Sequence, residues 1–183
     1  MNISLFRRNP ASAVVARNGA GNRFPSLEYP LSPRPRIAVL GLAVRPETGI
    51  YVLPEWTSAD LIAARPCALA GWFRELEQLG RLCQSGRLTL EHLSFPLVVF
   101  STPEDGPLSE ADHDRLWNWF QLPVFEQIRA RDGRLIAVEC DRRAGFHACY
   151  EDGHPNGVEL CTCGAARQWT PSYERTMAAA AGD

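Results

Sequence analysis

The sequence predicts an α/β protein that has a mixed sheet with flanking helices. Short apolar runs rich in β-branched residues alternate with segments of helical periodicity between residues 36 and 134. A length of 183 residues with 45% hydrophobic content suits one core with appendages. Four of the six cysteines and two of the four histidines crowd into residues 140–163, a density of ligands typical of small zinc-stabilised segments. We therefore also predict a C-terminal β-rich segment that is stapled by zinc.

Four apolar runs predict strands. They are residues 37–43, 49–53, 95–100 and 135–138. The first two are expected to pair across a turn that contains Pro46 and Gly49. The last one leads into the cysteine-rich segment.

Three segments predict helices. Thr57 or Ser58 can cap a helix that runs to about residue 64 and ends before Pro66. Residues 69–79 have helical periodicity, with an apolar face that includes Trp72.

The third helix covers residues 109–120. Ser109 followed by Asp112 is typical of a capping box. Leu116, Trp117 and Phe120 share one side of this helix and are expected to turn inward.

Changes in composition divide the chain into four parts: an Arg/Pro-rich N-terminal arm (1–35), an α/β core (36–134), a zinc-binding segment (135–172) and a C-terminal tail (173–183). The arm holds five arginines, five prolines and one acid, Glu28, which disfavours continuous helix. It is either a solvated tail, an arm that lies across the acidic surface of a protein partner, or an organelle-targeting segment.

Composition also narrows the function. All 19 basic residues are arginine, so the chain has no lysine for adenylation, phosphate binding or a Schiff base. A net charge of −2 argues against general nucleic-acid binding. No apolar run reaches the roughly 20 residues of a transmembrane helix, and no secretory signal is visible, so a cytoplasmic protein is expected. The lack of lysine together with abundant Ala, Arg, Gly and Pro suggests a bacterial source.

The cysteines and histidines predict one zinc site. Cys161 and Cys163 flank a single residue and precede a glycine, while Cys140 and His147 lie upstream with six residues between them. The four form a C-x6-H-x13-C-x-C pattern that suits a closed structural Zn²⁺ site. Cys149 and, in the same segment, His154 are alternative ligands.

Residues 136–147 read IAVECDRRAGFH. This string resembles a segment of phenylacetate-CoA ligase-type adenylate-forming enzymes, in which A-x-E-C is followed by G-L-H. The step Cys161-Thr162-Cys163-Gly164 is similar to the later C-x-C-G-R-T step of that family. The resemblance implies a structural zinc on Cys140, His147, Cys161 and Cys163, and leaves Cys149 and His154 outside the site.

The chain also departs from that family. The resemblance covers residues 122–171, and residues 127–131 read QIRAR where the family has a tyrosine-glycine-x-threonine-glutamate motif. The Ser/Thr/Gly-rich phosphate loop and the adenylation lysine are missing from the sequence. Ligase chemistry is therefore not expected.

Two functional hypotheses follow. The first is a non-catalytic zinc-binding accessory or interaction protein, related to a fragment of these ligases and acting as a subunit of a larger assembly. It has no catalytic residue, and Glu139 would accept a hydrogen bond from the His147 imidazole. The alternative is a small metal-dependent hydrolase or acyl-transfer enzyme that uses a cleft beside the zinc segment, with Glu139, Cys149 and His154 around it.

Overall fold

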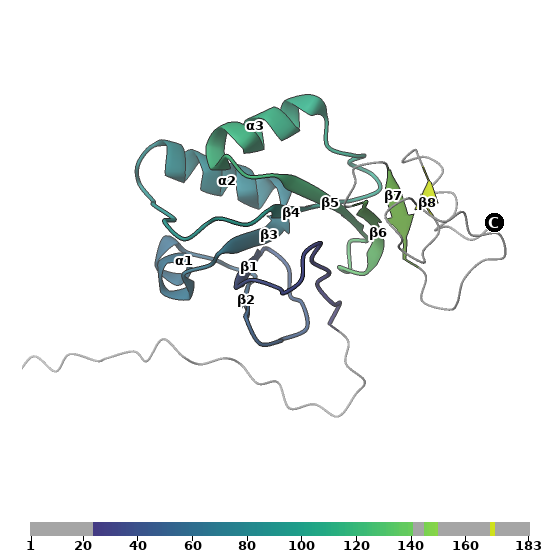
Figure 1. Cartoon of the computed structure of the whole chain (residues 1–183), viewed down its shortest axis with the longest axis horizontal. Helices are drawn as coiled ribbons and strands as arrows, with labels where there is room; N and C mark the ends of the chain where they lie inside the picture. The colour runs from purple at the N-terminus through teal and green to yellow at the C-terminus, as the bar shows by residue number, and fades with distance from the viewer. Residues whose placement is uncertain (1–23, 141–144, 150–168, 171–183) are drawn as a thin grey trace, which may run out of the picture.

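The computed structural model describes residues 24–140, 145–149 and 169–170. Strands and short helices follow one another along this part of the chain (Figure 1). In chain order the elements are β1 (Ile37–Leu40), β2 (Ile50–Leu53), α1 (Ser58–Ala64), β3 (Ala68–Trp72), α2 (Phe73–Gln84), β4 (Leu97–Ser101), α3 (Glu110–Phe120), β5 (Val124–Arg129), β6 (Leu135–Glu139), β7 (Phe146–Ala148) and β8 (Trp169–Thr170).

The strands form one mixed sheet in the order β2-β1-β3-β4-β5-β6-β7-β8. The first five are parallel, and β6, β7 and β8 continue the sheet in antiparallel fashion. The predicted mixed α/β fold with flanking helices is confirmed. The first two strands pair as expected, but in parallel, with Ile37 opposite Ile50.

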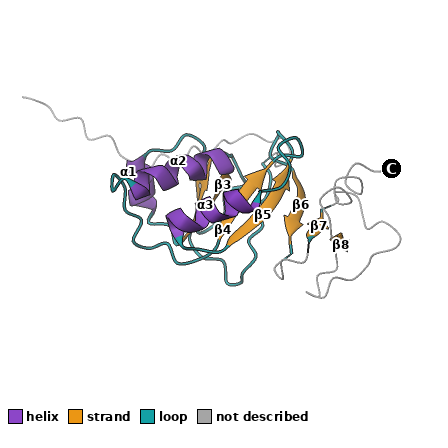
Figure 2. Cartoon of the chain, turned by 90° about the horizontal axis from the view of Figure 1, so that it is seen from above, coloured by secondary structure: helices purple, strands orange, loops and turns teal. Residues whose placement is uncertain are grey.

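Helices cover one face of the sheet (Figure 2). Leu61 of α1, Leu76 of α2 and Leu116 of α3 are fully buried in a cluster with the alternate residues of the parallel strands. Side chains alternate across a strand, so Leu97 and Val99 of β4 point toward these helices. Each of these leucines contributes about 1.5–3 kcal/mol through removal from water.

An extended segment covers the opposite face. Residues 24–35, here called the strap, lie on the side of the sheet away from α2 and α3 (Figure 1). Leu27 is 1% exposed in a second apolar cluster that includes Val98 and Phe100 of β4. The Tyr29 hydroxyl donates to Pro96 O at 2.9 Å. This part of the expected N-terminal arm packs on the chain's own sheet, and residues 1–23 lie outside the described residues.

The strap is fastened by polar side chains of β5. Arg129 Nη2 donates to Ser26 O at 3.0 Å, and Gln127 Nε2 donates to Glu28 O at 2.5 Å. Arg129 is fully buried, and its guanidinium carbon lies 4.7 Å from the centre of the Phe100 ring. Burial lowers the pKa of Arg129 to about 10, so the side chain stays charged at neutral pH.

Both capping predictions are confirmed. Thr57 caps α1, and Ser109 caps α3 through a complete capping box with Asp112. The predicted helix 69–79 is wrong at its start, because Ala68–Trp72 is the buried strand β3 and the helix begins only at Phe73. Trp117 is 49% exposed, which contradicts its predicted inward orientation.

No helix in the described part of the chain has the length and apolar character needed to span a membrane.

Candidate functional site

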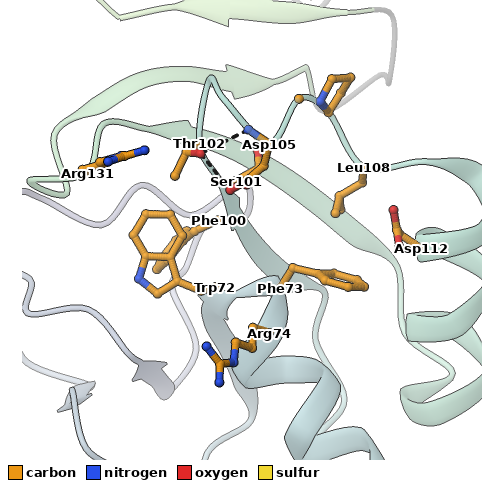
Figure 3. Close-up of a pocket in the computed structure, with 12 residues that line it drawn as sticks. Trp72, Phe73, Arg74, Phe100, Ser101, Thr102, Asp105, Leu108, Asp112 and Arg131 are labelled. Carbon is orange, nitrogen blue, oxygen red and sulfur yellow. Dashed lines mark hydrogen bonds between the residues drawn. The ribbon is translucent and has the colours of Figure 1, made fainter.

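A cleft of about 640 Å³ opens at the carboxyl ends of β3 and β4. In parallel α/β sheets this edge is where ligands bind. Figure 3 shows the aromatic side chains below the opening and the loop between β4 and α3 above it. The lining residues are Trp72, Phe73, Arg74, Phe100, Ser101, Thr102, Asp105, Gly106, Pro107, Leu108, Asp112 and Arg131.

Trp72 forms the apolar wall and joins two strand ends. Its indole Nε1 donates to Gly41 O, just after β1, at 3.0 Å. Its ring meets Phe100 edge-on, with 5.7 Å between ring centroids. Gly41 has a φ of +72°, and a Cβ there would lie 2.8 Å from Glu75 and 3.0 Å from Trp72. Close packing therefore fills the space between β1 and β3, and the open cleft lies beside β4.

A buried carboxyl lies behind the cleft. Glu126 of β5 is 3% exposed. It accepts from Ser101 Oγ at 2.5 Å and from the Leu108 amide at 3.2 Å. Burial raises the pKa of Glu126 to about 7, and the nearby charges of Glu139 and Asp112 act in the same direction. The carboxyl group thus gains or loses its proton in the physiological range.

Short hydrogen-bonded turns build the rest of the loop wall. The Thr102 hydroxyl donates to Asp105 Oδ2 at 2.7 Å (Figure 3). Asp112 accepts from the Ser109 amide at 3.0 Å and pairs with Arg115. These polar side chains hold neighbouring parts of the chain in place.

Two arginines supply the positive charge of the cleft. Arg131 lies 3.8 Å from Glu104 in an exposed pair, which contributes at most about 1 kcal/mol. Arg74, in the first turn of α2, makes no ion pair within the described residues. The Arg74 guanidinium is therefore available to a negatively charged ligand, and Arg131 can contact one by exchanging its weak pair with Glu104.

The predicted zinc ligands are only partly described. Cys140 is fully buried directly after β6, and His147 of β7 is 3% exposed. His147 pairs with Val138 across the two strands, so Cys140, two residues beyond Val138, shares that face with it. Cys161 and Cys163 lie outside the described residues, as does His154.

The prediction of a zinc-binding, metal-binding protein needs correction. Among residues 24–140, 145–149 and 169–170 there is no group of three or more His, Cys, Asp or Glu side chains that could hold a metal ion. A closed structural zinc site requires four protein ligands, and the described strands bring only Cys140 and His147 onto one face. The Cys149 thiol donates to His147 O at 3.8 Å, and Glu139 Oε2 accepts from the Glu126 amide at 2.9 Å.

Sequence reasoning missed the cleft. Glu104-Asp105-Gly106 reads as a turn, which is what the structure contains. The available signal was its position, because this turn directly follows a buried strand, and loops at that place line ligand sites in parallel sheets. Glu126 gave no signal of its own, since β5 was not predicted as a strand.

Comparisons with family models and curated proteins find no match, whereas the comparison with solved structures finds weak similarity. No model of a known protein family matches the chain, and no curated protein matches it. A solved structure of 2-hydroxyisobutyryl-CoA ligase, in an open conformation with 2-HIB-AMP and CoA, superposes with a TM-score of 0.47 at 12% identity. The match covers 63% of this chain and 30% of the ligase chain. This likeness to an adenylate-forming CoA ligase is weak and carries no functional conclusion.

Proposed function

We propose that this protein is a non-catalytic accessory protein that binds a small ligand in the cleft at the ends of β3 and β4. The observation that carries the proposal is that the polar side chains of the cleft wall are hydrogen-bonded to one another or to the sheet. Ser101 donates to Glu126, and Thr102 donates to Asp105. These bonds fix the walls of the cleft, which suits a preformed binding site.

The lining indicates the chemistry of the ligand. The Trp72 and Phe73 side chains offer apolar surface, and Arg74 and Arg131 also line the cleft. A ligand with a planar apolar part and one negative group would contact both. The exposed guanidinium groups can form charge-assisted hydrogen bonds worth about 1.5–3 kcal/mol each.

A relation to a fragment of the adenylate-forming ligases is part of this proposal. It is supported by the Ala137-x-Glu139-Cys140 and Gly145-x-His147 strings in the sequence. The lysine-free composition supports an accessory role over ligase chemistry. Action as a subunit beside a protein partner also remains a proposal.

The binding test uses 8-anilinonaphthalene-1-sulfonate, a flat aromatic anion that fluoresces in apolar clefts. We expect saturable binding of one molecule per chain, and a Kd about tenfold higher in Arg74→Ala, the loss of about 1.4 kcal/mol. Arg81→Ala is the matched control, because Arg81 lies on the same helix but outside the cleft. Equal affinities of the two variants would refute binding in this cleft.

Turnover is measured separately. The protein is incubated with ATP, Mg²⁺, CoA and benzoate, and AMP is quantified. No AMP above the background of a protein-free sample is expected. Release of AMP that depends on the protein would refute the non-catalytic assignment.

One observation favours a second candidate, an acyl-transfer enzyme that uses Ser101. A serine hydroxyl 2.5 Å from a carboxyl whose pKa is about 7 has the geometry of a nucleophile and its base. The Leu108 amide on the same carboxyl favours the structural role. Incubation with p-nitrophenyl acetate decides between them: a burst of nitrophenol with an acetyl group on Ser101, lost in Ser101→Ala, would establish the enzyme.

A further inference from the structure

A second cavity, of about 510 Å³, lies at the opposite edge of the sheet from the cleft. Residues at the end of α1 (61–66) and in the connection from α2 to β4 (86–92) line it. Each of these segments leads into a parallel strand, so the second cavity lies at the amino ends of β3 and β4. The cleft opens at the carboxyl ends of the same strands, and the two sites are therefore separate.

The guanidinium group of Arg65 has an unusual partner in this cavity. Its Nε donates to His92 Nε2 at 3.0 Å, and its Nη2 lies 2.8 Å from the same nitrogen. This Nε–Nη2 edge offers two parallel donors, which match the two oxygens of a carboxylate or a phosphate. Here a single imidazole nitrogen, uncharged because it accepts, occupies that edge. An oxyanion would form stronger, charge-assisted bonds in the same place.

A second guanidinium group belongs to the same cavity. Arg87 follows α2, and its amide donates to Leu82 O at 3.0 Å, while Gly86 before it has a φ of +69°. This arrangement is a Schellman motif, which closes the end of the helix. The amide of Arg65 donates to Leu61 O at 3.1 Å at the end of α1. Both arginine side chains therefore extend from fixed backbone positions.

The charges in the second cavity favour an anion. Neither Arg65 nor Arg87 forms an ion pair within the described residues. The ends of α1 and α2 each carry a partial negative charge of about half a unit, which is less than the full charge of each guanidinium group. Glu91 also lines the cavity, but its side chain is exposed and screened by solvent. The positive charge of the two arginines therefore dominates next to their donors.

Apolar side chains form the rest of the lining. Leu61 is fully buried, and Leu88 is 4% exposed, so they close the cavity toward the core. Ile62 lies at the rim with 59% of its surface exposed. A short aliphatic group placed over Ile62 would remove apolar surface from water. The lining thus suits a ligand with both an anionic and an aliphatic part.

We propose that the second cavity binds a small phosphate monoester that has a short aliphatic chain. The phosphate takes the Nε–Nη2 edge of Arg65 from His92 and also contacts Arg87. A phosphate monoester has three terminal oxygens for the two guanidinium groups, whereas a carboxylate has only two. The aliphatic chain lies against Ile62. This site does not depend on the function proposed for the cleft.

Titration of the full chain with butyl phosphate tests the site. The pH is 7.5, at which phosphate monoesters carry nearly two negative charges. In ¹H–¹⁵N NMR spectra, the Arg65 and Arg87 amides and the His92 ring should shift with one Kd on the order of 1 mM. The Arg74 amide, in the cleft, should not shift. Shifts at Arg74 with none at Arg65 would place the ligand in the cleft and overturn the proposal.

Three substitutions test the roles of the side chains. Arg65→Gln and Arg87→Gln should each raise the Kd about tenfold, whereas Arg81→Gln, an exposed position of α2 outside the cavity, should leave it unchanged. His92→Ala should lower the Kd about threefold, because the imidazole no longer competes for the Arg65 edge. A Kd in Arg65→Gln equal to that of the wild type, or weaker binding by His92→Ala, would overturn the proposal. If Arg65→Gln does not fold, Arg87→Gln decides in its place.

Methyl phosphate tests the aliphatic part of the ligand. Butyl phosphate should bind about fivefold more tightly, because its additional methylene groups partly leave water. In Ile62→Asn this advantage should disappear, while the Kd of methyl phosphate stays that of the wild type. Equal affinities of the two esters for the wild-type protein would overturn the assigned ligand class.

Discussion

Replacing Arg129 by methionine tests whether the strap is part of the folded core. Methionine keeps an unbranched side chain on β5 but removes the guanidinium group. Three acceptors then lose their donor: Gly133 O at 2.7 Å, Ser26 O at 3.0 Å, and Gln127 Oε1 at 2.7 Å. The cation–π contact with Phe100 is lost as well.

The magnitude follows from these contacts. Three charge-assisted hydrogen bonds at about 2 kcal/mol each and a cation–π contact of about 1 kcal/mol favour the native side chain. Burial of the charge opposes them by about 3 kcal/mol, because the pKa falls from 12.5 to about 10. We therefore expect Arg129→Met to lower the free energy of unfolding by about 4 kcal/mol.

The measurement is urea unfolding at pH 7.5, followed by far-UV circular dichroism. Arg129→Lys should cost more than half as much, because a single ammonium cannot reproduce the planar fork. Arg81→Met is the control, because its side chain is 68% exposed and should change stability by no more than about 0.5 kcal/mol. If Arg129→Met and the control are equally stable, the buried arginine does not hold the strap.

Two further predictions concern the helices. In Gly80→Ala the new Cβ would lie 2.5 Å from the Trp119 ring, so stability should fall by about 1–3 kcal/mol despite the better helix propensity of alanine; a rise in the urea midpoint would contradict the α2–α3 packing. Ser109→Ala removes the hydroxyl cap of α3 and should cost about 1 kcal/mol with an unchanged urea dependence. No loss of stability in this variant would mean that the cap contributes nothing.

The sequence predicts best the elements that local chemistry specifies. Thr57 and Ser109 predict where their helices begin, because a capping side chain bonds to a backbone amide only three residues away. The strand β4 is visible because a run of apolar, β-branched residues suits a strand buried on both faces. In each case, the information lies within a few residues.

The strand β3 was mispredicted as the start of a helix because the local pattern does not distinguish the two. Its sequence, ALAGW, joins directly to the amphipathic helix α2. A strand buried on both faces shows no alternation, so Leu69 and Trp72 fit the helical period of Leu76 and Leu79. Only pairing with β1, where Gly71 lies opposite Leu40, shows that the segment is extended. A Cβ at Gly71 would lie 3.0 Å from Leu40, so this glycine permits the close approach of β3 to β1.

The strand β5 was missed because its polar residues find partners far along the chain. Gln127 bonds to the backbone 99 residues away, and Arg129 to the backbone 103 residues away. Read locally, a segment VFEQIR with three buried polar side chains resembles a loop. Its partners, the strap and the β4–α3 loop, are fixed only when the whole sheet has formed.

The polar residues of β5 bond to both the strap and the β4–α3 loop, whose positions were not predicted from the sequence. Because side chains alternate along a strand, Glu126 points toward the helix-covered face, where it bonds to the Leu108 amide. Gln127 and Arg129 point toward the opposite face and bond to Glu28 O and Ser26 O of the strap. One strand therefore fastens both the wall of the cleft and the cover of the opposite face. Since these bonds are made on separate elements, Arg129→Met should weaken the strap while leaving the hydrogen-exchange protection of the Leu108 amide unchanged. Coupled changes at both places would instead show that β5 itself shifts, and that the strap and the cleft respond as a unit.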